Sequence, residues 1–109
     1  MRTLRFIVKG QTIERDPECD FDGLVPGSER YVQAKFILSP EWRGAAVVVS
    51  FWSVLGKEYD PQVLRVDNTC DIPVEALQRR TFKIGLVGKT SEGWKLRTNR
   101  VAVSQNGGI

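Results

Sequence analysis

Two runs of strand length decide the fold of this chain: residues 30–38 read RYVQAKFIL, and residues 45–52 read AAVVVSFW. The linker between them, residues 39–44, reads SPEWRG, with a proline near its start and a glycine at its end. Both runs are rich in β-branched and aromatic residues, which favour strands, and the linker has the composition of a turn. The pattern predicts a hairpin in a small all-β protein.

The two runs differ in how their apolar residues are distributed. In the first run, apolar and polar side chains alternate, which is typical of an antiparallel strand with one face in water. Four of its residues are expected to face the core, namely Val32, Ala34, Phe36 and Leu38. In the second run, only Ser50 interrupts a stretch that is apolar on both sides. We therefore expect the second strand to be central in a sheet or to take part in an interface.

The rest of the chain repeats this pattern of short strand-forming segments separated by turns, both before and after the two runs. Further strands are expected at residues 3–9, 12–14, 62–66, 81–87 and 94–103. The alternation of the last strand slips by one residue near Thr98 and Asn99, as it would at a β-bulge. One or two turns of helix are expected at residues 73–79, where Pro73 suits a first helical position.

Short strands at a spacing of roughly 8–12 residues are typical of a sandwich or barrel. We therefore predict an all-β fold, an Ig-like or jelly-roll β-sandwich of seven to eight short antiparallel strands with one short helical turn. Residues 1–103 are expected to form the β-sandwich module. Residues 104–109 include Gly107 and Gly108, lack periodicity and are expected to form a flexible tail.

Length and charge exclude several classes of protein. With 109 residues the chain fits one domain, which is long enough to bury a core without metals or disulfides. The 16 Lys and Arg residues exceed the 13 Asp and Glu residues by a net charge of +3. They are dispersed along the sequence, and we interpret the tightest cluster, Arg79, Arg80 and Lys83, as a solvated edge, so no nucleic-acid surface is expected. The chain shows neither a signal peptide nor a membrane span, which predicts a protein that is kept in a cytoplasm or released from one without secretion.

No group of residues is typical of a catalytic, metal or cofactor site. The chain has no histidine, and its two cysteines, Cys19 and Cys70, lack the spacing of a zinc site. We expect both thiols to be reduced unless the fold brings them together. Acidic residues alternate at positions 16–22 as Ca²⁺ ligands can, but the terminal glutamate and helices of an EF-hand are missing, which favours a solvated loop. We therefore expect no enzyme activity, no catalytic residue, no metal and no cofactor.

Aromatic residues supply the candidate interaction surface. Trp42 lies in the predicted turn, where a side chain can be exposed, and Arg43 follows it. Exposed Trp, Tyr and Arg side chains dominate the binding energy of protein interfaces. The candidate interface is therefore Tyr31, Trp42, Arg43 and Tyr59, with a core or loop-pinning role as the alternative for Trp42. The two remaining tryptophans are expected in the core or at a sheet edge, namely Trp52 and Trp94.

Several segments together resemble a family of small phage modules. These segments are LRFIVKGQTI at 4–13, CDFDGLVPG at 19–27, the stretch 31–42, IPVEAL at 72–77 and TNRVAVSQNGG at 98–108. The pattern is similar to modules encoded in phages and prophages of Gram-positive gut bacteria. It resembles the N-terminal modules of baseplate upper proteins and of tail-fibre or head-fibre proteins, and the resemblance spans nearly the whole chain.

The resemblance implies a structural protein of the virion that docks on other virion proteins during particle assembly or host attachment. It implies assembly in the bacterial host cytoplasm, either as a stand-alone decoration protein or as a truncated module, and it supplies no catalytic residues. A homo-oligomer and a cell-surface glycan are further partners that it makes plausible. Two alternative functions stay open: a carbohydrate-binding β-sandwich, and a cytoplasmic phage protein that binds a host factor.

Overall fold

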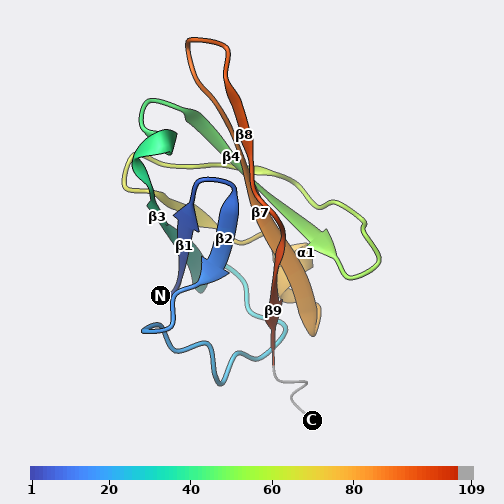
Figure 1. Ribbon diagram of the computed structural model, residues 1–109. Coiled ribbons are helices and arrows are strands. Elements are labelled where there is room, and N and C mark those ends of the chain that lie inside the picture. Colours follow the sequence, from blue (N-terminus) through green and yellow to red (C-terminus); the bar gives the residue numbers. More distant parts are fainter. Residues whose placement is uncertain (106–109) are drawn as a thin grey trace.

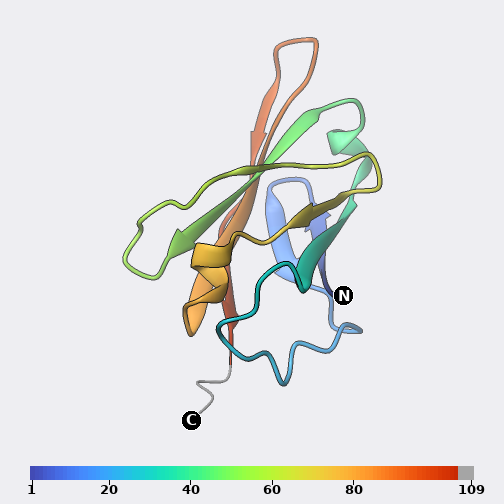
Figure 2. The same cartoon turned by 180° about the vertical axis from the view of Figure 1, so that it is seen from behind.

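The computed structural model describes residues 1–105 as two β-sheets packed around one core (Figure 1, and Figure 2 from behind). The first sheet has the order β2-β1-β3-β6, with β1 at Arg2–Lys9, β2 at Thr12–Arg15, β3 at Val32–Leu38 and β6 at Thr69–Asp71. The second has the order β5-β4-β7, with β4 at Ala46–Ser53, β5 at Gln62–Val63 and β7 at Thr81–Lys89. Two short strands share the remaining edge of β7, namely β8 at Lys95–Arg97 and β9 at Val101–Ser104. The predicted all-β sandwich is confirmed, but the described residues form nine strands, which corrects the expected seven to eight.

Alternation of side chains along the strands builds the core. In β3, Val32, Ala34 and Phe36 are buried as predicted, whereas Leu38 is only partly buried. The ring of Phe36 stacks on that of Phe6, a buried residue of β1, with 5.5 Å between the centroids. Phe51 and Phe82 face them from the second sheet, with 6.3 Å between their own centroids. The inward residues of both sheets form one apolar cluster, and its burial holds the two sheets together.

The two runs that decide the fold do not form a hairpin with each other. Strand β3 pairs with β1 and β6, whereas β4 pairs with β5 and β7, so residues 39–44 cross from one sheet to the other. Strand β3 is also parallel to β1 over seven residue pairs, which corrects the expectation of antiparallel strands throughout. The crossing contains the short 3-10 helix η1 at Pro40–Trp42, and its buried Trp42 directs the chain toward the second sheet.

The predicted bulge links the two sheets. Between β8 and β9, residues 98–100 lie opposite only two residues of β7, so the one-residue slip near Thr98 and Asn99 is confirmed. The Thr98 hydroxyl accepts the backbone N–H of Leu86 at 2.9 Å. The Asn99 side chain accepts the backbone N–H of Ile13 at 2.8 Å and donates to the Ile13 carbonyl at 3.2 Å. Asn99 therefore pairs with the edge of β2 and closes one side of the sandwich.

The helix and the last strand meet near the end of the described chain. The single turn of α1, at Val74–Leu77, follows Pro73, as the proline predicts. Gln105 is buried, and its side-chain amide donates to the carbonyls of Leu77 at 3.0 Å and Arg79 at 2.7 Å. These bonds satisfy carbonyl groups that the end of a helix leaves free. The ordered sandwich thus extends to Gln105, beyond the expected boundary at residue 103, and residues 106–109 of the expected tail lie outside the described residues.

Candidate functional site

Trp42 is a core residue, which corrects its assignment to an exposed interface. Its side chain is 2% exposed, and its indole N–H donates to the carbonyl oxygen of Gly10 at 2.8 Å. The ring lies so close to Gly88 that a Cβ atom at that position would be 2.6 Å from Cζ3 of Trp42. Trp42 therefore fastens η1 to the β1–β2 turn and to β7, which is the loop-pinning role named as its alternative.

The other three residues of the predicted interface do not form one platform. Tyr59 is buried, its backbone N–H donates to the carbonyl of Phe51 at 2.8 Å, and its hydroxyl has no partner among the described residues. Tyr31 is exposed before β3 begins, whereas Arg43 is exposed after β3 and η1 have ended. A strand of seven residues spans roughly 20 Å, so Tyr31 and Arg43 lie at opposite ends of β3. Burial of Trp42 and Tyr59 also leaves Tyr31 as the one exposed aromatic side chain of the candidate interface.

The remaining tryptophans have opposite environments. Trp52 is buried on the outer face of β4, where the guanidinium carbon of Arg100 lies 3.8 Å from its ring centroid. The ring of Trp52 also covers Gly85, where a Cβ would be 3.3 Å from Cζ3. Trp94 is 67% exposed in the turn between β7 and β8, which corrects its expected place in the core or at a packed sheet edge. In Figure 1 this turn is the tip of the hairpin that projects beyond the sandwich.

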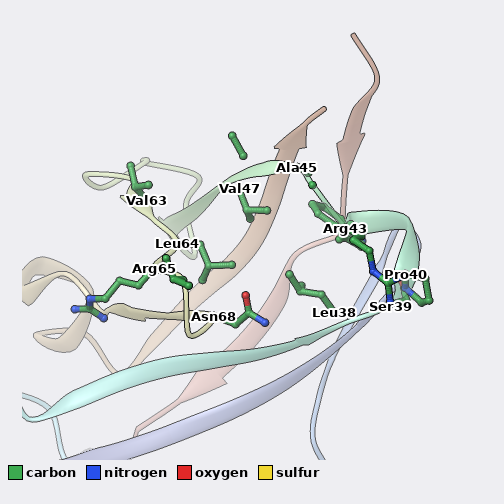
Figure 3. A pocket seen from close by; sticks show the side chains of 14 residues that line it. Leu38, Ser39, Pro40, Arg43, Ala45, Val47, Val63, Leu64, Arg65 and Asn68 are labelled. Carbon is green, nitrogen blue, oxygen red and sulfur yellow. The ribbon is translucent and has the colours of Figure 1, made fainter. Parts of the chain in front are cut away.

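A hollow of about 580 Å³ lies where β3 ends and β4 begins (Figure 3). We call it the end groove and define its apolar lining as Leu38, Val47, Val63, Leu64 and Val66. In Figure 3, the side chains of Leu38 and Leu64 approach each other across the gap between β3 and β4. Sequence analysis placed Arg43 on a candidate surface, and Arg43 does line this groove. Val66 was not predicted, because no local pattern shows that this residue lines a groove together with residues of β3 and β4.

The rim of the end groove combines exposed valines with arginines. Val66 is fully exposed and Val63 is 76% exposed, so both present apolar surface to water. Arg65 lines the groove with its stem, but its guanidinium points away, because its Nη2 forms an ion pair with Oδ1 of Asp71 at 2.7 Å. This ion pair raises the pKa of Arg65 further above its ordinary value. Arg43 has no carboxylate within ion-pair distance among residues 1–105, so its charge remains available.

The outer face of the second sheet is a second exposed surface, and strand register defines it. Val63, Val48 and Val87 lie side by side across β5, β4 and β7, and Arg97 of β8 ends this row. Lys89 and Lys95 occupy the row on one side of the valines. On the other side, beyond Ser50 and Gly85, lie Lys83, which is opposite Trp52, and Arg100, whose guanidinium covers the Trp52 ring. Sequence analysis predicted that the second face of β4 is covered or lies in an interface. Trp52 and Ser50 are covered, whereas Val48 is partly exposed and Ala46 is exposed.

Metal-ligating side chains and thiols do not cluster in the described residues. Within residues 1–105, no three His, Cys, Asp or Glu side chains are placed to hold a metal ion together. Of the alternating acidic residues at positions 16–22, Asp16 is buried and pairs with Arg5 at 3.1 Å, whereas Glu18, Asp20 and Asp22 are exposed, as a solvated loop predicts. Both cysteines are free, as expected, and burial raises the pKa of the Cys70 thiol to about 12. No helix in this part of the chain is long and apolar enough to cross a membrane.

We expect the two thiols to differ sharply in reactivity. In the folded protein at pH 8, an aromatic disulfide reagent should label partly exposed Cys19 and leave buried Cys70 unlabelled, because the thiolate is the nucleophile. The ordinary pKa of 9.0 is raised on folding, so between pH 9 and 12 the unfolded chain loses a proton that the folded chain keeps. Stability should therefore fall by up to about 1.4 kcal/mol per pH unit in that window. Rapid labelling of two thiols per native chain would contradict the burial of Cys70.

Comparison of the chain with protein-family models, with curated proteins and with solved structures gives no match. The observations that bear on its function are therefore the end groove, the outer face of the second sheet and the resemblance of its segments to phage modules.

Proposed function

We propose that the protein is a structural module of a bacteriophage particle, in the tail, baseplate or a fibre, which docks on other virion proteins through the end groove. The phage assignment rests on the resemblance of its segments to baseplate and fibre modules. The observation that supports docking is the exposed apolar rim of the groove at Val63 and Val66. The proposed location is the virion, after assembly in the host cytoplasm.

The physical argument for docking concerns the cost of leaving this rim in water. Burying a valine side chain completely is favourable by roughly 1.5–3 kcal/mol relative to leaving it exposed. Val66 contributes no burial free energy within the chain, because its side chain is fully exposed. Apolar centres with arginine at the border are common where proteins bind each other, and Arg43 occupies that position here. An apolar segment that carries a carboxylate fits this groove.

Quantitative mass spectrometry of purified phage particles tests the proposal. We expect the protein in particles, near the copy number of the capsid lattice for head decoration or at a few copies for a baseplate or fibre. Its absence from particles would overturn the virion assignment and favour the host-factor alternative.

The contribution of the groove is tested with the variant Val66→Asp. It should reduce incorporation into particles by at least about tenfold, because a buried unpaired carboxylate costs more than 1.4 kcal/mol. Leu55→Asp is the matched control, since Leu55 is 95% exposed in the turn after β4, away from the groove. Both variants should keep the wild-type circular dichroism spectrum. Equal incorporation of Val66→Asp and wild type, or loss of incorporation with Leu55→Asp alone, would show that docking does not use the end groove.

A further inference from the structure

The outer face of the second sheet concentrates positive charge that the sequence spreads over eighteen residues. Five cations gather there, and they are Lys83, Lys89, Lys95, Arg97 and Arg100. In the described residues, carboxylates lie only along the β4 border of this face, where Glu58 is opposite Trp52 and exposed Asp60 lies between Glu58 and β5. The outer face of the first sheet is balanced by comparison, because Arg5 pairs with Asp16 and both Glu14 and Asp71 lie on it. The two faces of the sandwich therefore differ in charge.

The chemistry of the face selects its occupant. A partner must supply carboxylates to meet the five cations, together with a small apolar patch to cover Val48 and Val87. Two copies cannot meet face to face through this surface, because each would oppose its own cations. Single-stranded nucleic acid fits less well, since it binds by stacking successive bases on aromatic rings. Trp52 is already covered by Arg100, which leaves Trp94, before Lys95 at the hairpin tip, as the one exposed tryptophan beside these cations in the described residues.

The chain itself carries a complementary surface in the loop between β2 and β3. Three carboxylates are exposed there, those of Glu18, Asp20 and Asp22, and none is in an ion pair within residues 1–105. Val25, which is 54% exposed, adds an apolar side chain to the same loop. The name acidic loop is used below for residues 16–25.

The acidic loop is held in one conformation before any contact forms. The guanidinium of Arg2 donates to the carbonyl of Asp20 at 3.0 Å and also to the carbonyl of Asp22. Asp16 accepts the Glu18 N–H at 2.9 Å, and Asp20 accepts the Asp22 N–H at 2.8 Å. These bonds use backbone groups and leave the side chains of Glu18 and Asp22 unengaged. A preformed loop loses little conformational entropy on binding, which favours association.

We propose that the acidic loop of one copy docks on the outer face of the second sheet of the next copy. Both cartoon views place the acidic loop at the end of the molecule opposite the β7–β8 hairpin, and the molecule is 48 Å long (Figures 1 and 2). The contact therefore joins two different surfaces. Contacts of this kind repeat from copy to copy and give a closed ring or an open filament. The inference goes beyond docking at the end groove and rests on different residues.

Sedimentation velocity of the purified full chain tests this association through charge reversal. Wild type should sediment faster as its concentration rises, and the effect should weaken between about 50 mM and 500 mM salt because the contact is electrostatic. Lys95→Glu/Arg97→Glu exchanges the charges of the two cations of β8, and Glu18→Lys/Asp22→Lys exchanges those of two loop carboxylates. Each should raise the dissociation constant by at least about tenfold. The chain that carries all four substitutions should recover part of the association, because the four exchanged residues can again pair with residues of opposite charge.

Sedimentation velocity also supplies the control and the outcomes that would contradict this association. Lys9→Glu/Lys57→Glu makes the same change in net charge as Lys95→Glu/Arg97→Glu at two exposed sites that belong to neither surface, and it should associate like wild type. A wild type that stays monomeric at every concentration and salt would overturn the proposal, and so would failure of the fourfold variant to associate while it remains folded. Binding of a single-stranded oligonucleotide that Lys95→Glu/Arg97→Glu abolishes, without self-association, would assign the face to nucleic acid instead. None of these outcomes bears on whether the protein is found in phage particles.

Discussion

Replacing Trp42 with Ala should lower the free energy of unfolding by about 3–5 kcal/mol, the range for truncating a buried Trp or Phe to Ala. The indole is almost completely buried, and its removal opens a cavity where η1, the β1–β2 turn and β7 meet. It also leaves the carbonyl of Gly10 without the donor that now lies 2.8 Å away. Since small domains are stable by only about 5–15 kcal/mol, the variant should be partly unfolded near physiological temperature.

Urea denaturation followed by circular dichroism measures this loss. Trp94→Ala is the matched control, because it removes the same side chain from a position that is 67% exposed. Surface substitutions of this kind usually change stability by less than about 0.5 kcal/mol. If Trp42→Ala were as stable as wild type, then Trp42 would not be part of the core, and the exposed-interface hypothesis would stand again.

The parts of the fold that depend on local pattern could be predicted from the sequence. Alternation along residues 32–38 identifies which side chains of β3 enter the core, and Pro73 marks the start of the helical turn. The slip in alternation near Asn99 identifies the bulge, because an extra residue changes which face each later side chain occupies. Each of these features is set by residues within a few positions of one another.

Strand partners could not be predicted, because they depend on contacts between distant segments. A proline, a glycine and two flanking strands are typical of a hairpin, yet residues 39–44 connect two sheets. In the structure the Trp42 ring fills a cavity bordered by Gly88 of β7 and by the carbonyl of Gly10 in the β1–β2 turn, so this linker is in contact with both sheets. Neither glycine is near Trp42 in sequence, so local composition carries no sign of the cavity.

Prediction of the candidate interface was also limited by contacts between distant segments, which the sequence does not show. Aromatic residue type identifies side chains that can bind a partner, but exposure decides whether they do, and exposure is a property of the assembled fold. Trp42 and Tyr59 are buried, whereas Trp94 is exposed at the hairpin tip. The cluster of cations on the outer face of the second sheet was not predicted, because these residues come from β7, β8 and the bulge. Only the register of the strands places them on one face. Dispersal of charge along a sequence is therefore a poor guide to its dispersal in space.

Gly88 is the position where the dependence of the fold on Trp42 can be measured directly. Gly88→Ala should lower the free energy of unfolding by about 1–3 kcal/mol through overpacking, toward the upper end because the ring it meets is rigid and buried. The added Cβ would lie 2.6 Å from Cζ3 and 2.8 Å from Cε3 of Trp42, which is closer than van der Waals contact allows. The backbone of Gly88 does not require positive φ, so the expected loss is steric and not conformational.

A double-mutant cycle separates this steric effect from any general intolerance of side chains in β7. In the Trp42→Ala background the space above Gly88 is empty, so Gly88→Ala should cost little there. The two substitutions should then couple by about 1–3 kcal/mol, as residues in direct contact do. Urea denaturation of the four proteins gives this coupling energy. If the cost of Gly88→Ala were the same in both backgrounds, the two residues would not be in contact, and the Trp42 ring would not be what joins η1 to the second sheet.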